Sequence, residues 1–288
     1  MKLVHTRSQL RDELEPARRG GRTIGLVPTM GALHEGHLAL LAAARERCEV
    51  VVMSLFVNPA QFGPGEDLGA YPRDQARDEE LAREAGVDIL YAPAADDVYP
   101  EDFATAVEVG GGLTDVLDGD PERRGPEHFR GVTTIVAKLL NAVGPTFAFF
   151  GQKDAQQAIV VNRMVRDLEF PVEIVTVPTV RAADGLALSS RNAYLDDAER
   201  RRATGLSRAL AAAERAAGKS ASLQDVIAAA RAELQAAGVE PEYLEARDAE
   251  SLREVDRLDG RPVLLAVAAM VGRARLIDSI VIQGGTGR

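Results

Sequence analysis

The sequence has few cysteines, no long apolar run and no excess of positive charge, and each shortage excludes a class of protein. Its 288 residues include a single cysteine, Cys48, so no disulfide can form within the chain, which suits the cytosol. Cys48 stands in the helix-like run LALLAAARERCEV, where we expect a buried, unpaired thiol rather than a nucleophile. The longest apolar stretch, VLLAVAAMVG from Val263, is too short to span a bilayer, and the N-terminal residues lack the apolar core of a signal peptide. We therefore expect a soluble, cytoplasmic protein with no membrane partner.

Basic residues are in the minority, with 34 Lys and Arg against 44 Asp and Glu, which gives a formal net charge of -10. A long anionic polymer such as DNA or tRNA would meet general repulsion, and no basic stripe offsets it, so we expect no nucleic-acid partner. A few placed cations can still bind small anions. The composition, 46% hydrophobic and 27% charged, is typical of a globular protein with one large domain or two modest ones.

Apolar and polar segments alternate as repeated β-α-β over the first 180 residues. We expect strands at 23–28, 50–58, 87–91, 146–151 and 172–178, and helices at 8–19, 37–47, 73–85, 133–143 and 154–168. This order predicts an α/β fold with a Rossmann-like, doubly wound parallel sheet. In such a sheet, ligands bind beyond the carboxyl ends of the strands.

The pattern changes after residue 181. A polar loop at 183–192 precedes two Ala-rich helices between Asp196 and Ala237, and strands follow at 243–247, 263–271 and 276–282. We therefore predict two domains, a doubly wound domain at residues 1–180 and a smaller α+β domain at 181–288 that can close over a ligand.

The loop from Pro28 to His37, PTMGALHEGH, lies between a predicted strand and the N-terminus of a helix, where unpaired amides favour a phosphate. It matches neither the dinucleotide G-x-G-x-x-G nor the P-loop motif. The H-E-G-H spacing is one residue shorter than the zinc motif H-E-x-x-H, so we expect no metal site there. We favour phosphate contact for His34 and His37; the alternative is that they only cap or pack the helix.

The segment GQKD, at 151–154, again follows a strand and opens a helix, so it should project from the same edge of the sheet. Lys153 can place a cation against a triphosphate, although a solvated helix start would use the same residues. Gln157, one helical turn beyond Lys153, would face the same pocket.

The segment LSSRN, at 188–192, follows the predicted domain boundary. Ser189 and Ser190 offer hydroxyls, and Arg191 offers a planar guanidinium suited to phosphate. The alternative is an ordinary loop before a helix cap.

Five segments together resemble the signature segments of the pantothenate synthetase family, in order and spacing, over essentially the whole chain. They are PTMGALHEGHLAL, FVNPAQFGPGEDLGAYPR, HFRGVTTIVAKLLN, FFGQKDAQQ and GLALSSRNAYL. The resemblance implies the Rossmann-like fold of the HxGH nucleotidyltransferase superfamily. It also implies an ATP-dependent ligase that activates pantoate as an acyl-adenylate and joins it to β-alanine, releasing AMP and pyrophosphate, with Mg²⁺ as cofactor and a homodimeric assembly.

The resemblance also implies roles for particular residues, with His37 as an acid candidate and Gln61 close to β-alanine as well as to pantoate. Residues expected to bind ATP are Met30, Gly31, Ala32, Leu33, His34, Glu35, Gly36, His37, Gly151, Gln152, Lys153, Asp154, Val180, Leu188, Ser189, Ser190 and Arg191. Those expected to be catalytic are His34, His37, Lys153, Ser189, Ser190 and Arg191. Those expected to bind pantoate are Pro28, Met30, Gln61, Tyr71 and Gln157.

The chain departs from the family pattern at Gln152, where Glu is common, and at Leu188, where Met is frequent. Neither departure removes a charged catalytic group. Two alternatives to this function are another nucleotidyltransferase or tRNA-charging fragment of the same superfamily, and a non-catalytic nucleotide-binding regulator. The acidic charge argues against tRNA, and the intact His34, His37, Lys153 and Arg191 argue against a catalytically inactive protein.

Overall fold

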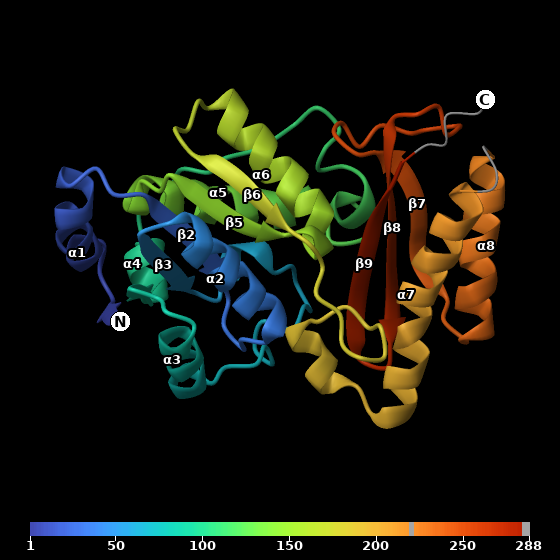
Figure 1. Cartoon of the computed structure of the whole chain (residues 1–288), viewed down its shortest axis with the longest axis horizontal. Helices are drawn as coiled ribbons and strands as arrows, with labels where there is room; N and C mark the ends of the chain where they lie inside the picture. Colours follow the sequence, from blue (N-terminus) through green and yellow to red (C-terminus); the bar gives the residue numbers. More distant parts are fainter. Residues whose placement is uncertain (219–221, 284–288) are drawn as a thin grey trace. The chain divides into compact units, whose positions relative to one another are not determined.

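The computed structural model describes residues 1–218 and 222–283, and the chain divides into two compact units (Figure 1). Unit 1 consists of Met1–Gly151 and Val160–Pro178, and unit 2 consists of Gln152–Ile159 and Thr179–Arg288. The division falls inside one helix, α6 (Ala155–Asp167), whose first residues group with unit 2. Each unit has its own sheet.

The sheet of unit 1 has six strands, all paired in parallel, in the order β1-β4-β3-β2-β5-β6. The strands are β1 (Lys2–Val4), β2 (Ile24–Thr29), β3 (Val50–Leu55), β4 (Ile89–Tyr91), β5 (Phe147–Gly151) and β6 (Glu173–Val177). The predicted α/β class and parallel sheet are therefore confirmed.

The strand order reverses between β2 and β5. From β2 the chain continues to β3 and β4 on one side, whereas β5 lies on the other side of β2 and is followed outward by β6. Since β2 and β5 run in parallel, their carboxyl ends, at Thr29 and Gly151, reach the same edge of the sheet. This reversal is the position at which doubly wound sheets bind their ligands.

Helices and short 3₁₀ turns connect these strands. They are α1 (Arg7–Arg19), α2 (Glu35–Arg47), η1 (Pro59–Gln61), α3 (Gln75–Glu84), α4 (Ala95–Val98), η2 (Leu117–Gly119), α5 (Pro126–Val143), η3 (Gln152–Asp154) and α6 (Ala155–Asp167). Leu40, Leu41 and Ala44 of α2 pack in one apolar cluster with sheet residues such as Val51 and Phe149. Apolar burial of this kind supplies most of the stability of a helix in a folded protein.

Cys48 lies in the same cluster and is 5% exposed and unpaired, as the sequence predicted. Burial raises the pKa of its thiol, while the charges of Arg45 and Arg47 oppose that shift. A thiol kept in the protonated form is a poor nucleophile, so the structural role predicted for Cys48 fits its surroundings.

The clearest differences from the sequence predictions concern one strand and the start of one helix. Strand β1 was not predicted, because three residues are too few to show a period-2 pattern. Helix α5 begins at Pro126, well before the predicted start at residue 133. Pro126 occupies the first turn, where its missing N–H costs nothing, and Gly131 sits inside the helix for a reason of packing described below.

Unit 2 contains an antiparallel sheet in the order β7-β8-β9, covered by a pair of helices. Its elements are η4 (Ser190–Tyr194), α7 (Asp197–Ala217), α8 (Leu223–Ala236), β7 (Pro241–Asp248), β8 (Pro262–Val271) and β9 (Ala274–Gln283). Small buried residues such as Ala209, Ala213 and Ala230 let α7 and α8 approach closely over a core that includes Leu265 and Val267. The predicted smaller α+β arrangement is confirmed in this part of the chain.

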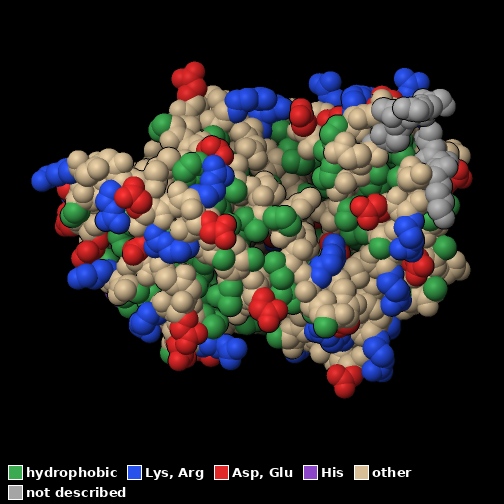
Figure 2. Space-filling model, viewed as in Figure 1, with side chains coloured by type: hydrophobic (Ala, Val, Ile, Leu, Met, Phe, Trp, Pro, Cys, Tyr) green, Lys and Arg blue, Asp and Glu red, His purple; other side chains and the backbone are tan. Residues whose placement is uncertain are grey.

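Within the described residues, none of the helices combines the length and the apolar character needed to cross a membrane. Basic and acidic side chains are interspersed over the face of the molecule shown in Figure 2.

Candidate active site

His34 and His37 stand at the start of α2, directly beyond the carboxyl end of β2. His34 is the N-cap residue, and its Nδ1 accepts a hydrogen bond from the backbone N–H of Gly36 at 3.1 Å. The Nδ1 of His37 accepts from the backbone N–H of His34 at 3.3 Å, and the two rings lie 4.1 Å apart. Both histidines therefore cap the helix, which agrees with the capping role that the sequence analysis gave as the alternative to phosphate contact.

Capping and ligand binding are compatible, because the two interactions use different ring nitrogens. An Nδ1 that accepts a hydrogen bond carries no proton, so the neutral ring of His34 or His37 has its hydrogen on Nε2. A neutral imidazole in that tautomer donates from Nε2, the form that can donate to a phosphate oxygen. The cap thus fixes the orientation and the tautomer of both rings.

The turn before α2 is held by a buried carboxylate that the sequence did not reveal. Asp78 of α3 is 2% exposed, and its two oxygens accept from the backbone N–H groups of Ala32, at 2.9 Å, and Leu33, at 2.8 Å. Burial raises the pKa of Asp78, while these two hydrogen bonds oppose the shift. Gly31 has a φ of +86°, and a Cβ on it would lie 2.8 Å from Asp78 Oδ2 and from Leu55 Cδ1. Only glycine fits this turn.

A sequence signal for Asp78 does exist, although it is weak. Asp78 and Ala82 are spaced i, i+4 in α3, and both are buried. An aspartate in register with the buried alanine of an amphipathic helix needs a partner inside the protein.

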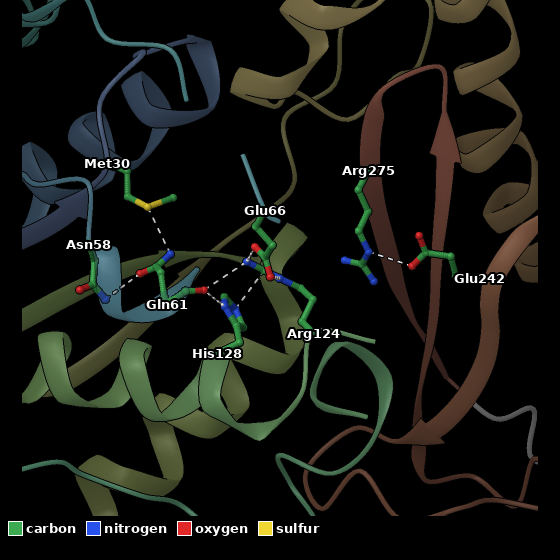
Figure 3. Close-up of polar contacts among 8 residues, drawn as sticks. All are labelled: Met30, Asn58, Gln61, Glu66, Arg124, His128, Glu242 and Arg275. Atoms are coloured by element: carbon green, nitrogen blue, oxygen red, sulfur yellow. Dashed lines mark hydrogen bonds and ion pairs between the residues drawn. The ribbon is translucent and has the colours of Figure 1, made fainter. Parts of the chain in front are cut away.

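Gln61 is buried at the end of η1, and its side-chain amide is fixed from both sides, as Figure 3 shows. Its Nε2 donates to Met30 Sδ at 3.2 Å, and its Oε1 accepts from Asn58 Nδ2 at 3.1 Å. Asn58, which is 1% exposed, also donates to the carbonyl of Gly131 at 3.1 Å and accepts from the Tyr99 hydroxyl at 2.8 Å. The structure therefore brings together Gln61 and Met30, both predicted to contact pantoate.

Helix α5 packs against the η1 turn that carries Gln61, and the contact is made at Gly131. A Cβ on Gly131 would overlap the carbonyl of Ala60, so the helix backbone packs directly on the η1 turn. This close approach explains a glycine in the interior of a helix, where it costs about 1 kcal/mol in propensity.

His128 and Arg124 hold the backbone carbonyl of Gln61 (Figure 3). His128 Nδ1 lies 2.7 Å from that carbonyl oxygen, and Arg124 Nη1 lies 3.1 Å from His128 Nε2. Since arginine only donates, Nε2 accepts and Nδ1 carries the proton. Burial, reinforced by the charge of Arg124, lowers the pKa of His128 to about 4. His128 is therefore a neutral hydrogen-bonding group at neutral pH.

Arg124 is paired in turn with Glu66, by contacts of 3.1 Å and 2.7 Å. Burial alone would raise the pKa of Glu66, but the hydrogen bonds and charge of Arg124 leave it lowered. The chain of contacts runs from Glu66 through Arg124 and His128 to Gln61 (Figure 3). The segment that contains His128 is one of the five that resemble the family, but the sequence predicted no role for His128, Arg124 or Glu66.

The remaining predicted residues of unit 1 lie at the same edge of the sheet or close to it. Pro28 is half-buried in β2 and pairs in register with Ser54 of β3. Tyr71 is buried, with its ring edge-on to Phe62, the residue after Gln61, at 5.9 Å between centroids. Gly151 ends β5, beside β2.

Unit 2 holds the other predicted site residues. Lys153 and Asp154 lie in η3, with Lys153 Nζ 3.5 Å from Asp154 Oδ1, and the Lys153 side chain is 19% exposed. Gln157 follows in the first turn of α6 and is half-buried. The Gln152 carbonyl accepts a hydrogen bond from Ser279 Oγ of β9 at 3.3 Å, which ties η3 to the sheet of unit 2.

The segment from Val180 to Arg191 forms a closed loop in the same unit. Arg181 and Ala187 form an antiparallel bridge, and the Leu188 N–H donates to the Val180 carbonyl at 3.0 Å. Ser189 then caps η4, since its Oγ accepts from the Arg191 N–H at 3.3 Å. Ser190 follows Ser189 and is half-buried. The loop is thus ordered by its own backbone contacts and presents Ser189, Ser190 and Arg191 together.

No group of three or more His, Cys, Asp or Glu side chains is placed to hold a metal ion within residues 1–218 and 222–283. In unit 1 the structure groups the capping histidines at the end of β2 and fixes Gln61 against Met30. In unit 2, two segments contact β9. They are the turn at Gln152–Asp154, here called the Lys153 turn, and the loop from Val180 to Arg191, here called the serine-arginine loop. The residues grouped in unit 1 therefore offer backbone amides and neutral donors, whereas those grouped in unit 2 include the cations Lys153 and Arg191.

Comparison with known proteins points to one family along nearly the whole chain. A family model described as pantoate-beta-alanine ligase matches residues 2–281. The chain is 52% identical to a pantothenate synthetase of Moorella thermoacetica, over 98% of this chain and 99% of the relative.

Solved structures give the same result. A pantothenate synthetase from Thermus thermophilus superposes with a TM-score of 0.91 at 48% identity, covering 97% of this chain and 99% of that chain. A pantoate-beta-alanine ligase from Francisella tularensis, complexed with β-γ ATP and β-alanine, superposes with a TM-score of 0.81 at 28% identity, covering 100% of both chains.

Proposed function

The chain belongs to the pantoate-β-alanine ligase family, and we propose that it activates pantoate as an acyl-adenylate at a site built from the loops described above. The reaction is the ATP-dependent ligation of pantoate and β-alanine to pantothenate. The observation that carries this function is the match of one family over nearly the whole chain. The residue roles that follow are our proposal.

Activation is needed because a carboxylate is a poor acyl donor, since its leaving group would be oxide. The pantoate carboxylate attacks the α-phosphorus of ATP, the bond to the bridging oxygen breaks, and pyrophosphate leaves. The amine of β-alanine then attacks the acyl carbon of the adenylate, loses a proton, and releases AMP. Both steps develop negative charge on oxygen, so they are accelerated by donors and cations fixed in advance.

We assign these donors to the two loop systems. His34 and His37 donate to phosphate oxygens through Nε2, while Lys153, Ser189, Ser190 and Arg191 neutralise the charge that develops as pyrophosphate leaves. Lys153 follows Gly151 by two residues, so the chain itself attaches it to the sheet edge at which β2 also ends.

The neighbouring predicted residues complete the nucleotide site. They are Met30, Gly31, Ala32, Leu33, Glu35, Gly36, Gly151, Gln152, Asp154, Val180 and Leu188.

Mg²⁺ enters with ATP in this proposal. The described residues include no cage of three or more carboxylates, histidines or cysteines, and Mg²⁺ keeps several of its waters and binds substrate phosphates. In this proposal the ATP phosphates and water would hold the ion, which would neutralise part of the phosphate charge.

Pantoate is bound, in our proposal, by the amides of Gln61 and Gln157, with Pro28, Met30 and Tyr71 around it. Gln61 is suited to selection because Asn58 and Met30 fix its side-chain amide before any ligand arrives. An acid without the pantoate hydroxyls would leave hydrogen-bonding capacity of the buried Gln61 amide unpaired, at a cost of about 1–3 kcal/mol.

Residues 1–180 then act as the binding domain and 181–288 as a domain that closes over the adenylate and excludes water. We also propose a homodimer in the cytosol, with small molecules as the only substrates. Light scattering of the purified chain tests the assembly, since a monomer mass at micromolar concentration would contradict the homodimer.

The function is tested by incubating the purified chain with ATP, Mg²⁺, pantoate and β-alanine and identifying the products by mass. The expected products are AMP, pyrophosphate and pantothenate. Pantoate-dependent exchange of labelled pyrophosphate into ATP, without β-alanine, tests the adenylate separately. ADP as the product, or exchange that does not depend on pantoate, would contradict the proposal.

A further inference from the structure

Strand β9 carries two adjacent polar residues, Asp278 and Ser279, that are almost completely buried. They are 2% and 5% exposed, respectively. Side chains alternate along a strand, so Asp278 lies on the same face as Leu276 and Ile280, which belong to the apolar core of unit 2. Ser279 lies on the opposite face. A carboxylate in a row of core residues is unusual and needs a partner.

The partner of Asp278 is Arg181, at the base of the loop that carries Ser189, Ser190 and Arg191. Arg181 Nη1 lies 2.6 Å from Asp278 Oδ2, and Nη2 lies 3.0 Å from Oδ1, a bidentate pair. Arg181 Nη1 also donates to the Gly185 carbonyl, at 3.3 Å, in the turn of the same loop. The guanidinium therefore ties both the base and the turn of the loop to β9.

Ser279 makes the corresponding connection to the Lys153 turn. Its N–H donates to Asp278 Oδ1 at 2.8 Å, and its hydroxyl donates to the carbonyl of Gln152 at 3.3 Å. Gln152 is the residue before Lys153 in η3. The adjacent residues Asp278 and Ser279 of β9 thus contact, one each, the two segments of unit 2 that were predicted to bind phosphate.

Folding stability alone is a poor reason for this arrangement. Replacing a buried ion pair by apolar residues of similar volume is often neutral or stabilising, because desolvation of the charges offsets their attraction. Leucine at 278 would continue the apolar row of β9. The charge is better explained by the geometry that it imposes on its neighbours.

We propose that Asp278 and Ser279 are positioning residues for adenylation, which hold the serine-arginine loop and the Lys153 turn in a fixed relation to each other. This inference rests on the proposed function, in which those two segments bind the phosphates of ATP. Neither Asp278 nor Ser279 contacts substrate in this role. Their effect is on the rate of pyrophosphate release, because the groups that they place stabilise charge in the transition state.

The test compares an apolar pair with the parental chain in pantoate-dependent pyrophosphate exchange. The double variant Asp278→Leu with Arg181→Met removes both charges, so it should keep the parental melting temperature. We expect its kcat for exchange to fall about 30-fold or more, with KM for pantoate within about twofold, because Gln61 is untouched. Parental kcat in this variant would overturn the inference, since a pair with only a structural role predicts that result.

Single variants keep the test decisive if the double variant does not fold. Ser279→Ala removes one hydroxyl and should lower kcat about threefold at unchanged KM and melting temperature. Asp278→Glu keeps the charge and should recover more activity than Asp278→Asn. Parental kcat in Ser279→Ala, or equal kcat in Asp278→Glu and Asp278→Asn, would refute the positioning role.

Glu233→Gln is the matched control. It removes a carboxylate of the same unit that pairs with Arg208, 3.7 Å away, between α7 and α8. This variant should exchange pyrophosphate at the parental rate. The unaltered chain is assayed first: without pantoate-dependent exchange there, the proposed function itself fails, whereas parental exchange in the β9 variants refutes only the role of Asp278 and Ser279.

Discussion

The two units fix their candidate ligand groups by different means. In unit 1, the side-chain amide of Gln61 is held by the neutral Asn58 amide and Met30 sulfur, and its backbone carbonyl is held by the neutral imidazole of His128 together with Arg124. In unit 2, the serine-arginine loop is held at its base by a buried charge pair, Arg181 with Asp278. The difference corresponds to the proposed tasks. In our proposal, selection of pantoate depends on the neutral hydrogen bonds of the Gln61 amide, whereas handling of phosphate depends on charge.

The largest effect is expected from Lys153→Met, which tests the charge-based half of this comparison. Removing one preorganised charge donor costs about 10²–10³-fold in kcat. Stability should change by less than about 0.5 kcal/mol, because the contact of Lys153 with half-exposed Asp154 is 3.5 Å long. Exchange kinetics and thermal melting measure the two quantities.

Lys2→Met, which removes a lysine that is 70% exposed, serves as the control for Lys153→Met and should leave both quantities unchanged. A kcat for Lys153→Met within threefold of the parental value would show that charge at residue 153 does not drive adenylation.

The pH dependence of the unfolding free energy tests whether the imidazole that holds Gln61 is neutral. The pKa of His128 is lowered from 6.5 to about 4, so between these values the unfolded chain binds a proton that the folded chain does not. The stabilising contribution is fully present above pH 6.5 and is lost as the pH falls towards 4, by about 3 kcal/mol. Denaturant unfolding at pH 7, 5.5 and 4 measures it, and His128→Gln should flatten this part of the curve.

The parental chain in the same buffers is the reference for this titration. Identical curves for the parental chain and His128→Gln would mean that His128 is not held neutral by its contacts.

Gln61→Glu tests whether pantoate recognition needs a neutral amide. The change keeps the size of the side chain and removes the donor that contacts Met30. An unpaired or wrongly charged group in a buried site costs about 2–3 kcal/mol, so kcat/KM for pantoate should fall about 10²-fold.

Gln235→Glu, on the exposed face of α8, introduces the same charge and should have no effect. Steady-state kinetics with varied pantoate separate the two variants. A normal kcat/KM for Gln61→Glu would remove this residue from the substrate site.

The sequence predicted the parallel sheet because most of its strands are short apolar runs separated by turn residues and amphipathic helices. It failed where an element carries little periodic signal. Strand β1 has three residues, and the first part of α5 contains Gly131, which is kept for close packing on Ala60 rather than for helix propensity. Local preference and tertiary packing conflict at such positions, and only the folded chain shows the packing.

The candidate site was likewise predicted only in part from the sequence. Topology alone located the loops that begin at Pro28 and Gly151, because chain order determines which strand ends share an edge. Gln61 came only from family resemblance. Asp78, His128 and Asp278 were missed, since each acts on a segment more than 40 residues away in the sequence and their meaning arises from those contacts.

A smaller effect on activity is expected from Asp78→Asn, which removes a buried carboxylate of unit 1 and so tests whether that unit also depends on charge. Asp78 accepts from two backbone N–H groups of the turn before His34, and asparagine can accept only through one oxygen. One unsatisfied buried N–H costs about 1–3 kcal/mol, so unfolding free energy should fall by about 2 kcal/mol. Exchange should slow about tenfold as the capping histidines lose their fixed position. Glu80→Gln, on the exposed side of α3, is the matched control and should change neither value. Parental stability in Asp78→Asn would mean that the turn is held by its own backbone, without the carboxylate of Asp78.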